Sequence, residues 1–176
     1  RDHKLQTFDG RQGLVLAPRR PDASLYLITA FMGDTWTLPA LQKFYPAGRV
    51  VKEARNPYGE LHPQVFAVDP DTEPVIRPQA PLAVNFQREH GSQGWVPSKT
   101  ASPMRDYTVF AHLLGPVNPA SGTPVWAGHD GPPLGNSHPT SRWQQGEVIV
   151  DRHELVLPAD IPAGTYTVQA LLHRYE

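Results

Sequence analysis

The stretch that most constrains the fold covers residues 139–172, PTSRWQQGEVIVDRHELVLPADIPAGTYTVQALL. Residues 147–157 are rich in β-branched and apolar side chains, a PADIPAG segment follows, and residues 165–172 alternate with a period of two. These signals predict a strand, a turn and a second strand, the latter half-buried and antiparallel. Its two faces carry Tyr166, Val168, Ala170 and Leu172 on one side, and Thr165, Thr167 and Gln169 on the other.

The region around this stretch has further strand signals. Residues 107–114, YTVFAHLL, are apolar on both faces, as expected of a central strand between two layers. Shorter strands are predicted at 82–87 and 124–127, and a long loop at 88–103, which has Gly, Ser and Pro around Trp95 and no alternation. We therefore expect residues 82–176 to form an antiparallel β-sandwich of jelly-roll or immunoglobulin-like type.

The first 70 residues predict a small α/β unit. Strands are expected at 13–17 and 24–30, both with the length of buried strands, and at 49–54 and 64–68, joined by an NPYG turn. Residues 35–45 predict a helix with Asp34 or Thr35 as its N-cap. Prolines and acidic residues then interrupt every period, so we expect a linker at 71–81 between the two units.

Composition agrees with a β-rich, turn-rich chain and narrows its partners. The 20 prolines and 14 glycines suit many turns between short strands, and 39% hydrophobic residues suffice for a packed core. Sixteen basic and 17 acidic residues argue against a nucleic-acid partner. The lack of cysteine excludes disulfides, thiolate metal sites and a cysteine nucleophile.

Several runs resemble a known family. RDYTVFAHLLGP and HDGPPLGNSHPTSRWQQGEVIVDRHELVLPADIPAGTYTVQALL are similar to the C-terminal extracytoplasmic β-sandwich of bacterial dolichyl-phosphate-mannose protein mannosyltransferase-like membrane proteins. FDGRQGLVLAP, LYLITA and LPALQKFYPAGRVVKEARNPYGELHPQVFAV are similar to the small α/β unit that precedes it. One departure is QREHGSQGWVPSKTASPM, where the family usually has a further strand pair.

The resemblance implies a function for the whole protein. Sugar transfer from a lipid-phosphate-linked donor would take place in a membrane-embedded part that this chain lacks. The chain itself would be a non-catalytic, extracytoplasmic accessory domain at the periplasmic or outer surface, tethered through that membrane region. Its expected partners are a glycan, a lipid-linked sugar or a polypeptide acceptor, and the parent membrane domain or a neighbouring subunit.

Tryptophans in predicted loops are candidates for contact with sugar, because an indole face can stack on a sugar ring. Each has a packing alternative, strongest for Trp143 at a strand entry, whereas Trp36 is expected in the core or as a hydrophobic staple. The ligand-binding candidates are Trp95, Trp126, Trp143, His129 and Asp130.

The histidines and acids of residues 82–176 were weighed as metal ligands. His112, His129, His138 and His153, with Asp130, Glu147, Asp151 and Glu154, lack zinc-site spacing, and His112 reads as a hydrogen-bonded core residue. Calcium at Asp130, Glu147 and Asp151 competes with a simple surface pair between Asp151 and Arg152. We expect no metal and no cofactor.

No catalytic motif is evident. A GxSxG elbow is absent, and the Gly-rich runs lack the strand–glycine–helix context of a phosphate loop. The alternatives to the accessory domain are a free carbohydrate-binding module of a secreted protein and a structural or assembly module of a surface complex. A stand-alone enzyme is the least favoured.

Overall fold

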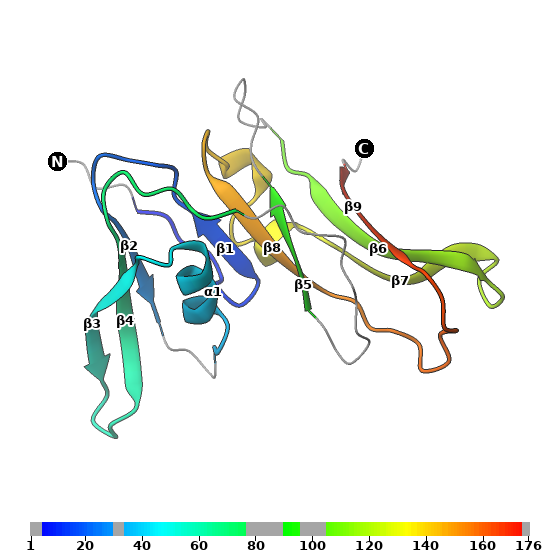
Figure 1. Ribbon diagram of the computed structural model, residues 1–176, viewed down its shortest axis with the longest axis horizontal. Helices are drawn as coiled ribbons and strands as arrows, with labels where there is room; N and C mark the ends of the chain where they lie inside the picture. The colour runs from blue at the N-terminus through cyan, green and yellow to red at the C-terminus, as the bar shows by residue number, and fades with distance from the viewer. Residues whose placement is uncertain (1–4, 30–33, 77–89, 96–104, 174–176) are drawn as a thin grey trace.

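The computed structural model describes residues 5–29, 34–76 and 105–173, together with the backbone of 90–95. Within these ranges the chain is mainly β, and all strand pairs are antiparallel. Figure 1 shows three sheets in succession: the sheet built around residues 148–154 lies in the middle, the sheet built around 61–68 lies on one side with the helix, and the sheet built around 108–118 lies on the other. The mainly β character expected from the sequence is confirmed.

The described residues form three sheets of three strands each, and none of these sheets is closed. Sheet A consists, in spatial order, of β1 (Gly13–Leu16), β8 (Val148–Glu154) and β5 (His90–Trp95). Sheet B consists of β2 (Ser24–Ile28), β4 (Leu61–Val68) and β3 (Arg49–Arg55). Sheet C consists of β7 (Thr123–Gly131), β6 (Thr108–Asn118) and β9 (Thr167–His173).

Helix α1 (Thr37–Phe44) confirms the helix predicted at 35–45. The Asp34 carboxylate accepts hydrogen bonds of 3.0 Å from the backbone N–H groups of Trp36 and Thr37, which have no partner within the helix. The helix packs through Ala40 and Leu41, both buried. The N-cap position itself is Trp36, so the helix begins one or two residues later than the predicted N-cap at Asp34 or Thr35, while Asp34 still binds the first N–H groups.

Sheet B confirms three predicted strands and corrects the burial of one. Residues 24–30 were expected to form a buried strand, but β2 buries Tyr26 and leaves Leu25 and Leu27 each 66% exposed. Pro63 lies within the central strand β4, at the irregularity where the register with β3 shifts. Proline has no N–H group to donate, and it is tolerated there because the irregular position needs no ladder hydrogen bond.

Sheet A joins a strand near the start of the chain to a strand from its last third. Gly13, Leu14, Val15 and Leu16 are all buried, and β1 pairs along its length with β8. Leu14 and Leu16 share a core with Val148 and Val150 of β8 and with Leu41 of α1. Segments assigned to different predicted units thus share one sheet and one core, and the division at 71–81 stays a prediction about independent folding.

The loop predicted at 88–103 is wrong for residues 90–95, which form β5 and pair with β8. The sequence HGSQGW has no apolar alternation, so it carries no strand signal. Its strand forms through backbone pairing with β8, which needs no such pattern. The strand predicted at 82–87 lies outside the described residues.

In sheet C, β6 is the central strand between β7 and β9, as predicted, but it is not buried on both faces as a strand between two layers would be. Its buried face carries Val109, Ala111 and Leu113, whereas Phe110 and His112 on the other face are half-buried. β9 follows the predicted alternation at first, with Val168 and Ala170 half-buried and Thr167 and Gln169 exposed, but Leu172, predicted on the buried face, is exposed. Among the described residues, no helix is both long and apolar enough to cross a bilayer.

Candidate functional site

The two faces of the central strand β8 lie in different environments. Val148 and Val150 pack into the core around α1, whereas alternate residues project to the other side of the sheet. There Ile149 packs against Leu134 and Trp143, which belong to the segment containing the two 3₁₀ turns η1 (Pro133–Asn136) and η2 (Thr140–Arg142). Asp151 and His153 continue the same row, and both are buried.

A histidine network, consisting of Asp151, His153 and His129, joins β8 to β7. The Asp151 carboxylate lies 2.9 Å from His153 Nε2, and its other oxygen accepts a 2.9 Å hydrogen bond from the backbone N–H of Leu134. His153 Nδ1 lies 2.8 Å from Nδ1 of His129, a residue that is exposed on β7. The buried carboxylate is thereby connected through one buried imidazole to an exposed one.

Glu147, just before β8, has a second buried carboxylate. Its oxygens accept hydrogen bonds from the Gln6 side-chain amide at 2.7 Å and the Gln144 backbone N–H at 3.0 Å, and His138 Nε2 lies 3.3 Å away. Burial alone would raise the pKa of Glu147, but the hydrogen bonds from His138, Gln6 and Gln144 outweigh it, and the pKa lies below its ordinary value. Glu147 is thus ionised inside the fold.

The η1 turn positions the backbone donor that Asp151 needs. Leu134, Gly135 and Asn136 have φ angles of 52°, 58° and 68°, so the turn is left-handed. Leu134 is completely buried, and its packing against Ile149 and Trp143 holds this conformation.

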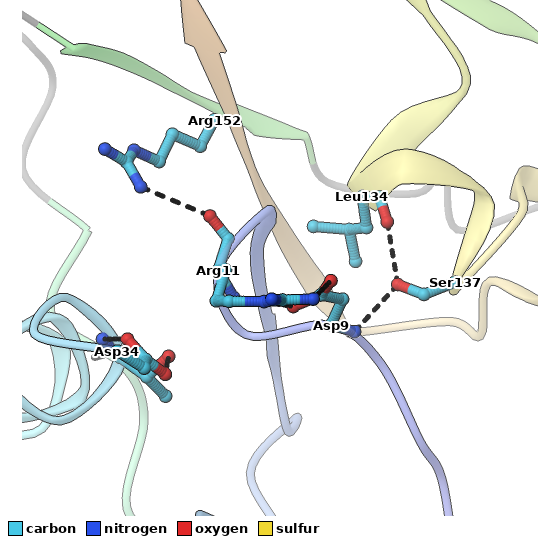
Figure 2. A network of polar contacts seen from close by, with 7 residues as sticks. Asp9, Arg11, Asp34, Leu134, Ser137 and Arg152 are labelled. Carbon is cyan, nitrogen blue, oxygen red and sulfur yellow. Dashed lines mark hydrogen bonds and ion pairs between the residues drawn. The ribbon is translucent and has the colours of Figure 1, made fainter. Parts of the chain in front are cut away.

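Polar contacts attach the η1 turn to the first residues of the chain (Figure 2). Ser137 Oγ donates to the Leu134 carbonyl at 2.7 Å and accepts from the Asp9 backbone N–H at 2.8 Å. Arg152 donates to the Arg11 carbonyl at 3.3 Å, and its guanidinium carbon lies 5.7 Å from the centre of the Trp36 ring.

The surface pair expected between Asp151 and Arg152 is wrong. Consecutive strand residues project to opposite sides of the sheet, so Asp151 faces the histidine network while Arg152 faces Trp36. A signal was present in VIVDRHE: three consecutive apolar residues indicate a strand buried on both faces, and Asp151 and His153 continue one of those faces.

The acids weighed as calcium ligands do not converge. Asp130 lies 3.0 Å from His112 Nε2, Glu147 is bound to His138, and Asp151 to His153. Among the described residues, no three His, Asp or Glu side chains are grouped so that they could hold a metal ion. His112, expected in the core, is half-buried on the open face of sheet C.

The tryptophans occupy different environments. Trp143 is 3% exposed and donates from Nε1 to the His138 carbonyl at 3.1 Å, so it is a packing anchor, the alternative that the sequence favoured. Trp36 packs beside the core around α1. Trp95 lies in β5 rather than in a loop, and its side chain lies outside the described residues.

Trp126 forms a half-exposed aromatic pair with Tyr166. The ring centres are 6.0 Å apart and the planes meet at 87°, an edge-to-face arrangement. Trp126 Nε1 donates to the Pro116 carbonyl at 2.7 Å, and Tyr166 Oη donates to the Pro162 carbonyl at 2.8 Å. A side chain at Gly115 would overlap the Tyr166 ring, so the tyrosine lies directly on the β6 backbone.

Sequence reasoning named Trp126 but treated Tyr166 only as a strand residue. The two are 40 positions apart, and only the pairing of β7 and β9 with β6 brings them together. The other candidates, His129 and Asp130, lie further along β7, bonded to His153 and His112 respectively. Comparison with protein-family models, curated proteins and solved structures finds no match to this chain.

Proposed function

We propose that this chain is a non-catalytic, extracytoplasmic accessory domain of a membrane glycosyltransferase-like protein, and that Trp126 and Tyr166 form its glycan-contact surface. In this proposal, sheets A and C are the two layers of a β-sandwich of jelly-roll or immunoglobulin-like type. The resemblance of the two halves of the chain to such domains supports the assignment to a membrane glycosyltransferase.

The observation that carries the proposal is the fixed aromatic pair. Stacking on a sugar ring requires an aromatic face that is accessible and held still, because every side chain ordered on binding costs free energy. The polar atoms of Trp126 and Tyr166 are already bound to backbone carbonyls, and Gly115 supports the tyrosine ring. The pair is therefore preorganised for a shallow contact with the apolar face of a sugar.

The arrangement of the buried acids supports display rather than catalysis. Glu147 and Asp151 are each bonded to a histidine and to a backbone N–H group. A catalytic acid or base must be able to reach a substrate proton. In the described residues, these two carboxylates instead connect β8 to its neighbours.

A glycan array tests the proposal. The chain should retain a subset of glycans, and Trp126→Ala and Tyr166→Ala should each lower retention by up to about 10-fold, which corresponds to the ~1.5 kcal/mol upper range for an aromatic contact. The matched control is Tyr58→Ala, because Tyr58 is 88% exposed at the β3–β4 turn and bonds through its backbone. Equal losses in all three variants would indicate nonspecific aromatic adhesion.

The alternatives give different results. A chain that retains no glycan but associates with itself or with another subunit would be a structural or assembly module. Glycan retention by a protein whose complete gene product has a secretion leader and no membrane spans would identify a free carbohydrate-binding module. Spanning helices upstream of Arg1 in the complete gene product would favour the accessory domain.

A further inference from the structure

The hydrogen bonds of the histidine network fix where its protons lie. An ionised carboxylate only accepts, so His153 must carry a proton on Nε2, which faces Asp151 at 2.9 Å. In a neutral His153, Nδ1 is then an acceptor. Since His129 Nδ1 lies 2.8 Å from it, a neutral His129 must carry its proton on Nδ1 and leave Nε2 bare.

The network can accept one more proton without losing a bond. With one proton added, either imidazole can be the cation, because the proton between the two Nδ1 atoms is donated from one side or from the other. The added charge also offsets the buried Asp151 carboxylate, which is 3% exposed as a residue. With a second added proton, both imidazoles are cations. Their Nδ1–H groups then face each other across the 2.8 Å contact, and the two positive charges repel.

Within the described parts of the chain, the nearby charged side chains point away from the network or are already paired. Arg152 and Glu154 project to the opposite side of β8, and Asp130 projects to the opposite side of β7, where it binds His112. Just before β8, Glu147 is already bonded to His138.

Among the residues that the structure describes, the strand positions opposite the network are uncharged. Three neighbouring strands present uncharged residues opposite it in register: Gly13 of β1, Ala111 of β6, and Gly91 and Gln93 of β5. In β9, Ala170 lies opposite Ala111, and the η1 turn contributes only the Leu134 backbone N–H.

We propose that the Asp151–His153–His129 network is a pH-dependent lock between β7 and β8, closed with zero or one added proton and opened by the second. Because β7 belongs to sheet C and β8 to sheet A, opening releases a contact between two sheets. This inference stands on the network alone and is independent of the glycan contact.

The direct test is the tautomer of each imidazole in the full chain, read from ¹⁵N chemical shifts by long-range ¹H–¹⁵N correlation. At about pH 8, above the ordinary imidazole titration range, His129 should be the Nδ1–H tautomer and His153 the Nε2–H tautomer. On acidification, the two should titrate as a coupled pair in two steps. An Nε2–H tautomer at His129, or independent single-step titrations, would overturn the proposal.

His129→Asn tests the consequence for stability. The Asn amide can donate to neutral His153 or accept from the protonated form, so it keeps the bond in both states without a charge. In the pH range in which the second proton binds, acidification should raise the unfolding equilibrium constant of the unaltered chain. The rise should be about 10-fold per pH unit steeper than in His129→Asn. Identical pH dependence would contradict the lock.

His112→Asn is the matched control, since His112 is also a histidine of sheet C bonded to an acid, but on the other face. It should leave the coupled titration of His129 and His153 unchanged. Because the NMR measurement uses the unaltered chain, it decides the proposal even where His129→Asn does not fold.

Discussion

The side-chain amide of Gln6 donates a 2.7 Å hydrogen bond to the buried carboxylate of Glu147, a residue 141 positions away in the sequence. We expect Gln6→Ala to lower the free energy of unfolding by about 1.5–3 kcal/mol, because a buried carboxylate loses a hydrogen-bond donor. Gln42→Ala, at an exposed position of α1, is the matched control and should be nearly neutral. Chemical denaturation of the two variants checks this, and equal midpoints would refute it.

The same carboxylate makes stability depend on acid pH. The pKa of Glu147 lies below its ordinary value of 4.5, because hydrogen bonds outweigh the effect of burial. The ionised group therefore stabilises the fold fully above pH 4.5, and this contribution disappears as the pH falls through the lowered pKa. Glu147→Gln lacks it, so the stability difference between the unaltered chain and Glu147→Gln should shrink below pH 4.5. A pH-independent difference would contradict this assignment.

Gly13 is required by the close approach of β1 to its surroundings. A Cβ at this position would overlap the Val150 carbonyl oxygen and a methyl group of Leu134, and backbone cannot move as a flexible side chain does. We expect Gly13→Ala to destabilise the fold by about 2–3 kcal/mol. At Gly164, where a Cβ would come no closer than 3.6 Å to Tyr166, alanine should be tolerated. Thermal unfolding of both variants distinguishes a specific clash from a general cost of replacing glycine.

The pairing of β1 with β8 predicts that residues 82–176 do not fold alone. Without β1, one edge of β8 loses its partner, and Val148 and Val150 lose Leu14 and Leu16 from their shared core. A ¹H–¹⁵N spectrum of the 82–176 fragment should be poorly dispersed, and a peptide of residues 5–17 added in trans should restore dispersion. A well-dispersed spectrum of the fragment by itself would instead support the division into two units at 71–81.

Local signals predicted the elements that depend on local chemistry. The hydrogen bonding of Asp34 to the start of α1, the apolar run of β1 and the turn between β3 and β4 can all be read from a few adjacent residues. Long-range pairing decided the rest. β5 could not be predicted, because it has no apolar pattern and pairs with β8 through backbone hydrogen bonds. Tyr166 and Trp126 come into contact only when β7 and β9 have both paired with β6. Asp151 looked like a surface acid because its backbone donor, Leu134, lies in a distant turn.

The central claim, that the chain displays a glycan-contact surface at Trp126, is tested most directly by NMR titration. The ¹⁵N-labelled chain has four indole N–H signals, one for each tryptophan. Pools of the array oligosaccharides should shift the Trp126 signal saturably and leave that of the buried Trp143 in place. If no pool moves the Trp126 signal, or if the chain converts a glycan into a new product, the account is contradicted.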